Sequence, residues 1–180
     1  MKMKITLLSL AFALFAIPAM AQLPQASEVP AGSLAPSDAE FLRTVDVSNI
    51  DQLTLGKRAS SGTKHSSVRS LADNVTASHN KADSALRILA DVKNVDLDHR
   101  MSERAKSEAA TLVSADPAAD RLYVTGVVRD SRDLIGLYES ALATSQDADI
   151  RKFADTMLPA VRDYQRQAEE LVDREGLAQE

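Results

Sequence analysis

Five polar residues with chemically useful side chains fall within the apolar rows of predicted helices. They are Gln52, His79, Asp130, Ser131 and Tyr164. Imidazole and carboxylate groups bind divalent metals, whereas amide, hydroxyl and phenol groups are weak metal ligands. Two interpretations follow: a buried, hydrogen-bonded polar cluster, with one of the other four as the partner of His79, or a metal site that keeps few ligands. The helical rows leave open whether Asp130 points inward or meets solvent.

Four long segments have apolar residues at every third or fourth position, which predicts four helices. They span about 38–61 and 66–93, then a third helix after Asp116-Pro117 and a fourth from Asp147 to Gly176. Ser37 and Glu40 have the spacing of a capping box at the first helix. The inward row of that helix is predicted to contain Phe41, Val45, Ser48, Gln52, Leu55 and Ala59.

The connection between the second and third long helices, residues 94–117, is too long for a tight turn. It contains a short polar helix at about 100–113, and His99 is expected to be exposed. A 28-residue helix is about 42 Å long, and only a connection of this size can return along it to start a parallel helix. The second and third long helices are therefore expected to be parallel. We therefore expect an all-α, ferritin-like four-helix bundle of two helical hairpins joined by a long crossover that contains a short helix.

The two predicted hairpins resemble each other at an offset of 82 residues without a gap. Apolar positions match, as do outward polar ones: Arg69 matches Arg151, and Asp51 matches Asp133. Apolar periodicity alone does not require matching polar residues. The repeat therefore favours duplication of one helical hairpin.

Six short stretches carry a resemblance to a known family over 38–168. They are DAEFL at 38–42, LGKRA at 55–59, SHNKA at 78–82, DRLY at 120–123, LYE at 137–139 and LPAVR at 158–162. The chain resembles an exported bacterial family of unknown function with a ferritin-like fold, whose members are often labelled periplasmic or outer-membrane proteins. That family carries no established reaction.

The resemblance implies a site with an acid on the first long helix and a histidine on each of the other three. Here His79 keeps the family residue, whereas Gln52, Ser131 and Tyr164 replace the other three. Di-iron bundles need several carboxylates and two Glu-x-x-His units, and this sequence contains no Glu-x-x-His. The resemblance therefore implies a degenerate metal site, and the sequence indicates no cofactor.

The N-terminus has the pattern of a signal peptide. Lys2 and Lys4 precede an apolar stretch over 5–17, and Ala19-Met20-Ala21 supplies the cleavage pattern. The apolar stretch is too short to span a bilayer, so it is expected to be a signal peptide at 1–21, cleaved after Ala21, and not a membrane anchor. No later segment approaches the length of a membrane span, so we expect a periplasmic or secreted protein. We expect a flexible proline-rich linker at 22–36, the bundle at 37–176 and a tail at 177–180.

The amino-acid composition excludes several classes of function. The chain has no cysteine, which excludes disulfides, thiol catalysis and cysteine-bound metals. Its net charge of −5 becomes more negative once the two leader lysines are removed, which disfavours nucleic-acid binding. The sequence favours a non-enzymatic binding or interaction role in the cell envelope, including during stress, with an unknown envelope protein or small ligand as partner. The alternative is a ferritin-like metal-binding or oxidant-handling protein that uses His79 and its polar neighbours.

Overall fold

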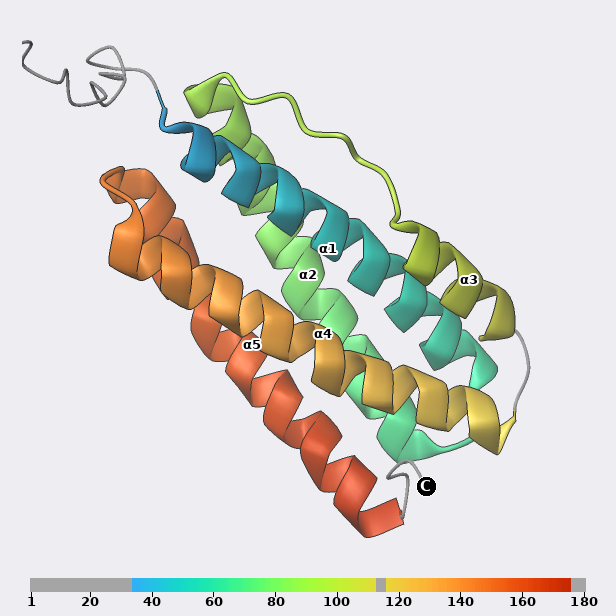
Figure 1. Cartoon of the computed structure of the whole chain (residues 1–180). Coiled ribbons are helices and arrows are strands. Elements are labelled where there is room, and N and C mark those ends of the chain that lie inside the picture. The colour runs from blue at the N-terminus through green and yellow to red at the C-terminus, as the bar shows by residue number, and fades with distance from the viewer. Residues whose placement is uncertain (1–33, 113–115, 176–180) are drawn as a thin grey trace, which may run out of the picture. The chain divides into compact units, whose positions relative to one another are not determined.

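The computed structural model describes residues 34–112 and 116–175, which contain helices and no strands (Figure 1). The helices are α1 (Pro36–Gly62), α2 (Ser66–Lys93), α3 (Glu103–Thr111), α4 (Pro117–Thr144) and α5 (Ala148–Glu175). The predicted all-α class is confirmed. The leader with its cleavage site, most of the 22–36 linker and the 177–180 tail lie outside the described residues. No helix within those residues is both long and apolar enough to cross a membrane.

The start of α1 differs from the predicted capping box. The helix begins at Pro36 with Ala35 as its N-cap, and no side chain caps it. The Ala35 carbonyl instead accepts hydrogen bonds from the N–H groups of Asp38 and Ala39, both at 3.0 Å. Proline is favoured in a first helical turn, because its φ angle is already helical and its missing N–H would have no partner there. Ser37 therefore lies inside the helix, and its prediction as the cap is wrong.

Two other predicted caps are confirmed. The Asp116 side chain accepts a hydrogen bond from the Ala118 N–H at 2.9 Å, before α4. The Asp147 side chain accepts from the N–H groups of Asp149 and Ile150, at 2.9 and 3.1 Å, before α5. These carboxylates satisfy N–H groups that have no partner within the first helical turn.

The four long helices pack so that each contacts two others. α1 contacts α2 and α4, and α5 also contacts α2 and α4. The long helices that contact each other run in opposite directions, while α2 and α4 run in the same direction (Figure 1). Lys93 at the end of α2 pairs with Asp147 and Asp149 at the start of α5, both at 2.7 Å, as an antiparallel pair requires. The crossover from α2 to α3 therefore runs along α1, against which α3 also packs.

The two hairpins repeat their buried end contacts at the offset of 82 residues. Asp38 in the first turn of α1 accepts a hydrogen bond from the Ser145 hydroxyl, after α4, at 2.9 Å. Asp120 in the first turn of α4 accepts one from the Thr63 hydroxyl, after α1, at 2.8 Å. All four side chains are buried. Because each pair is the other shifted by 82 residues, these contacts support duplication of a hairpin.

An arginine closes the turn of each hairpin in the same way. The Arg69 guanidinium donates to the Thr63 carbonyl at 2.6 Å, and the Arg151 guanidinium donates to the Ser145 carbonyl at 2.9 Å. Arg69 and Arg151 are a polar match of the sequence repeat. The repeat thus preserves specific contacts and not merely the apolar period.

Gly56 allows α1 and α2 to approach closely. A Cβ atom at this position would lie 2.5 Å from Thr76 Oγ1 and 3.3 Å from the Ala72 carbonyl oxygen. At Gly126 a Cβ atom would first meet a side-chain atom at 3.6 Å, and at Gly136 it would meet nothing within 4 Å. Of these three helical glycines, Gly56 is the one that packing requires.

Replacing Gly56 with alanine should lower the free energy of unfolding by about 1–3 kcal/mol, because the added methyl group overpacks against Thr76 and the α2 backbone. The matched change Gly136→Ala should raise it by up to about 1 kcal/mol, because alanine favours the helix and finds open space. Urea unfolding of both variants measures the difference. A Gly56→Ala variant as stable as the parent would contradict the close approach.

Candidate functional site

His79 lies on the buried side of α2 and makes two hydrogen bonds across the bundle. Its Nδ1 is 2.7 Å from Asn49 Oδ1 on α1, and its Nε2 is 3.0 Å from the Tyr164 hydroxyl on α5. With the Asn49 oxygen facing the ring, Nδ1 carries the proton and Nε2 accepts from Tyr164. Both ring nitrogens are therefore occupied by protein partners. The His79 side chain is closed to solvent, because the residue is only 2% exposed.

Burial keeps His79 and Tyr164 neutral. Desolvation lowers the pKa of His79 to about 4, against a smaller opposing effect of the Asp130 charge. Desolvation also raises the pKa of Tyr164 well above its usual value, with further contributions from Tyr138, Tyr123 and Asp130. At neutral pH the pair is an uncharged imidazole and an uncharged phenol, which suits a structural hydrogen bond in the core.

Gln52 and Asp130 form a second polar group that connects α1, α3 and α4. The Gln52 amide donates to Asp130 Oδ2 at 2.8 Å. Arg104 from α3 contacts both Asp130 oxygens, at 3.0 and 3.2 Å, and Arg129 Nε donates to Oδ1 at 2.8 Å. Glu108 pairs with both arginines. Asp130 thus points inward but is neutralised by two guanidinium groups.

The structure divides the five candidate residues between these groups. His79 and Tyr164 are bonded to each other, and Gln52 is bonded to Asp130. Ser131 joins neither pair, because its hydroxyl donates to the Val128 carbonyl of its own helix at 3.0 Å.

Asn49 is a site residue that the sequence row did not include. The row placed Ser48 inward between Val45 and Gln52, but Ser48 is partly exposed and Asn49 is fully buried. A step of four residues from Val45, followed by three to Gln52, would have selected Asn49 instead. Both steps fit a helix, and an apolar pattern cannot decide between two polar residues.

Two buried carboxylates of α1 hold the crossover, and one of them, Asp51, was expected from the repeat to point outward but is only 4% exposed. Asp46 accepts hydrogen bonds from the His99 N–H at 2.7 Å and from His99 Nδ1 at 2.9 Å. Asp51 accepts from the Ser102 N–H at 2.9 Å and from the Ser102 hydroxyl at 2.6 Å. Desolvation raises the pKa of Asp51, although the Ser102 bonds and Arg104 oppose that change. His99 is exposed as predicted, but its positive φ of 48° and its contacts give it a structural role.

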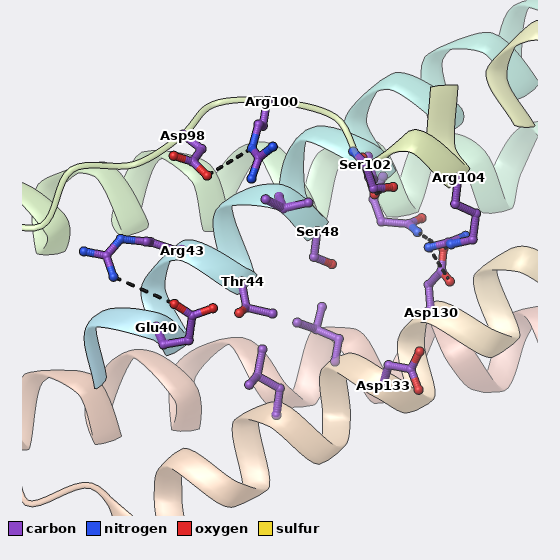
Figure 2. A pocket seen from close by; sticks show the side chains of 15 residues that line it. Glu40, Arg43, Thr44, Ser48, Asp98, Arg100, Ser102, Arg104, Asp130 and Asp133 are labelled. Carbon is purple, nitrogen blue, oxygen red and sulfur yellow. Dashed lines mark hydrogen bonds and ion pairs between the residues drawn. The ribbon is translucent and has the colours of Figure 1, made fainter. Parts of the chain in front are cut away.

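A cleft of about 670 Å³ opens beside these contacts, between α1, α4 and the crossover. Figure 2 shows Thr44 and Ser48 of α1 near its middle, with Asp130 and Asp133 on α4. Its apolar part consists of Val47, Leu134 and Leu137. The cleft is the place where side chains from three elements surround a volume that a small organic molecule can fill.

The residues present do not fit the metal centre that the ferritin-like resemblance implies. Within 34–112 and 116–175, no three His, Asp or Glu side chains are grouped so that they could hold an ion. The ring nitrogens of His79 are bonded to Asn49 and Tyr164, and Asp130 is bonded to two arginines. No mechanistic step is therefore assigned to a metal.

Comparison with known families decides the relationship of the chain. The family model for a domain of unknown function, DUF4142, matches residues 23–171. The chain belongs to the DUF4142 family. The match includes every candidate residue named above and confirms the family resemblance found in the sequence.

Three solved structures share the fold of this chain at low sequence identity. A DUF305 fragment from Deinococcus radiodurans has a TM-score of 0.69 and 16% identity, and the match covers 79% of this chain and 99% of that one. A DUF305 protein from Streptomyces coelicolor, named a putative secreted protein, has a TM-score of 0.65 and 16% identity over 81% and 96%. A putative spore coat protein from Bacillus halodurans reaches 0.65 and 12% over 82% and 93%. No curated protein matches the chain significantly.

The low pKa of His79 makes the folded chain sensitive to mild acid. The unfolded state binds a proton near pH 6.5 and the folded state only near pH 4, so stability is full above pH 6.5 and falls as the pH drops toward 4. We expect a loss of up to about 3 kcal/mol over this range. Urea unfolding at a series of pH values measures it. The variant His79→Gln should lose this part of the pH dependence, and an equal slope in both proteins would contradict the assignment.

The internal repeat provides a matched pair for testing the crossover contact. Asp51→Ala removes two hydrogen bonds to Ser102 and should lower the free energy of unfolding by about 1–3 kcal/mol. Asp133→Ala changes the repeat equivalent, which is exposed, and should alter stability by less than about 0.5 kcal/mol. Hydrogen exchange at the Ser102 amide should accelerate in the first variant alone. Equal effects of the two changes would count against the anchoring role.

Proposed function

We propose that this chain is an exported, non-enzymatic ferritin-like bundle that acts by binding in the cell envelope, with the cleft along α1 as the binding site. The observation that carries the proposal is the contrast between two regions. The polar groups of the core bind one another and are closed to solvent, whereas the cleft of about 670 Å³ is open.

The arrangement of the helices supports the ferritin-like part of the proposal. Two antiparallel helix pairs, α1 with α2 and α4 with α5, are joined by a crossover that makes α2 and α4 parallel. This is the topology of bundles with one long connection. We place the folded domain at residues 37–176, with α1 beginning one residue earlier.

The leader pattern supports export. A signal peptide at 1–21 with cleavage after Ala21, followed by the 22–36 linker, would deliver the bundle to the periplasm or the medium. The likeness to a Streptomyces coelicolor protein named as a putative secreted protein agrees with that address.

The chemistry of the core supports a binding role over catalysis. A general acid or base works best with a pKa near the operating pH and with access to a substrate. His79 has a pKa of about 4 and is closed to solvent, and the pKa of Tyr164 is far above its usual value. The same pairing leaves the metal-binding alternative without free ligands at His79.

The dimensions and lining of the cleft suit a small organic ligand. Ligand pockets commonly have volumes of about 300–1,000 Å³ with an apolar surface and a few oriented polar groups. Here Val47, Leu134 and Leu137 provide the apolar surface, and charged side chains from α1, α4 and the crossover surround it. We therefore propose that the function is ligand binding in the cleft and not a reaction of the core polar groups.

Filling the cleft should abolish ligand-dependent stabilisation. Ser48→Trp places a large ring in the cleft, whereas Ser140→Trp places the same ring at an exposed position of α4 outside it. A set of small soluble compounds is tested for increases in the melting temperature of each protein. Compounds that bind the cleft should stabilise the parent chain and Ser140→Trp, but not Ser48→Trp.

Compounds that stabilise Ser48→Trp as strongly as the parent chain would place binding elsewhere and contradict the proposal. A compound set that stabilises none of the three proteins would also count against it. The chain contains no native tryptophan, so the fluorescence of each introduced ring reports that it has the expected exposure.

A further inference from the structure

The cleft carries more negative than positive side chains. Five carboxylates and three guanidinium groups line it. Each arginine already has an acidic partner in the lining: Arg43 with Glu40, Arg100 with Asp98, and Arg104 with Asp130. Two acids, Asp51 and Asp133, remain without a cationic partner among them. The charge that a ligand would meet is therefore negative.

Asp51 and Asp133 differ in what they bind, although they occupy the same position in the internal repeat. Asp51 accepts two hydrogen bonds from Ser102 of the crossover. Asp133 is exposed, and no hydrogen bond or ion pair to it exists within the part of the chain that the structure describes. The fold thus shows this carboxylate position accepting N–H and O–H donors in one hairpin, and leaves it open to a ligand in the other.

A second acceptor in the lining also lacks a donor. Gln52 is 4% exposed and lines the cleft, and its amide donates to Asp130. Its Oε1 atom has no hydrogen-bond partner. Buried polar atoms are normally satisfied, but this oxygen is closed to solvent, so the choice of ligand depends on Asp133 and not on Gln52.

The neighbours of Asp133 on α4 specify the remainder of the ligand. Leu134 follows it directly and Leu137 lies one helical turn further on, with Val47 of α1 also in the apolar lining. Leu134 is already buried, but Val47 and Leu137 are only partly buried, and an aliphatic chain would remove their remaining surface from water while a charged head group stays at the carboxylate.

The geometry points to an aliphatic primary amine as the ligand of the cleft, with its ammonium group on the Asp133 carboxylate and its hydrocarbon chain over Val47, Leu134 and Leu137. This inference rests on the proposed binding function and adds the chemical class of the ligand. Such amines are protonated at pH 7, as the lysine side chain is. The ammonium hydrogens supply the donors that the Asp133 carboxylate lacks.

Isothermal titration calorimetry with hexylamine tests the assignment on protein expressed from the complete sequence. The parent chain should bind hexylammonium at pH 7, and the affinity should fall as salt is added. Asp133→Asn should bind about tenfold more weakly, because a charge-assisted hydrogen bond is lost. Asp155→Asn, which changes an exposed acid of α5 outside the cleft, should bind as the parent does.

Titrations with hexanoate and hexan-1-ol test whether binding requires the positive charge or only the hydrocarbon chain. Neither should match hexylammonium, because hexanoate carries the wrong charge and hexan-1-ol carries none. Absence of hexylammonium binding, or equal binding by Asp133→Asn, would overturn the assignment. If hexanoate or hexan-1-ol binds instead and Ser48→Trp prevents it, the ligand class is wrong while the cleft remains a binding site.

Discussion

Buried carboxylates on α1 and α4 are the constraint on which the remaining structure depends. A carboxylate without a partner in the protein interior costs several kcal/mol, so each such group fixes the segment that supplies its donors. Asp38 and Asp120 fix the turns at opposite ends of the bundle, and Asp46 and Asp51 fix the crossover along α1. The cleft lies between α4 and the crossover that these carboxylates hold against α1.

The core and the cleft divide the polar residues into two chemically different sets. In the core, the His79 ring hydrogen-bonds to Asn49 and to Tyr164, and these contacts between uncharged groups join α1, α2 and α5. In the cleft, charged side chains such as Asp98, Arg100 and Asp133 are exposed to solvent.

Periodicity predicted the helices well because apolar rows report which face of a helix is buried. The limits of α2 matched the sequence, and the caps at Asp116 and Asp147 followed from side chains that satisfy free N–H groups. Periodicity could not choose between Ser48 and Asn49, because both fit a helical row and only tertiary contacts distinguish them. Ser102, which binds Asp51, and Arg104, which binds Asp130, come from the crossover, and a polar segment carries no apolar pattern from which its position could be predicted.

The internal repeat has a consequence for how this protein can change. If a bundle formed from two separate copies of one hairpin, every substitution would occur twice, so a histidine in the core would be present in both halves. In the fused chain, the equivalents of Asn49, Gln52 and His79 are Ser131, Leu134 and Val161. The partners of His79 and Gln52 in the second hairpin, Tyr164 and Asp130, come from positions that are not their equivalents in the repeat. Covalent fusion thus permits an asymmetric interior, with one carboxylate of an equivalent pair used for folding and the other left for recognition.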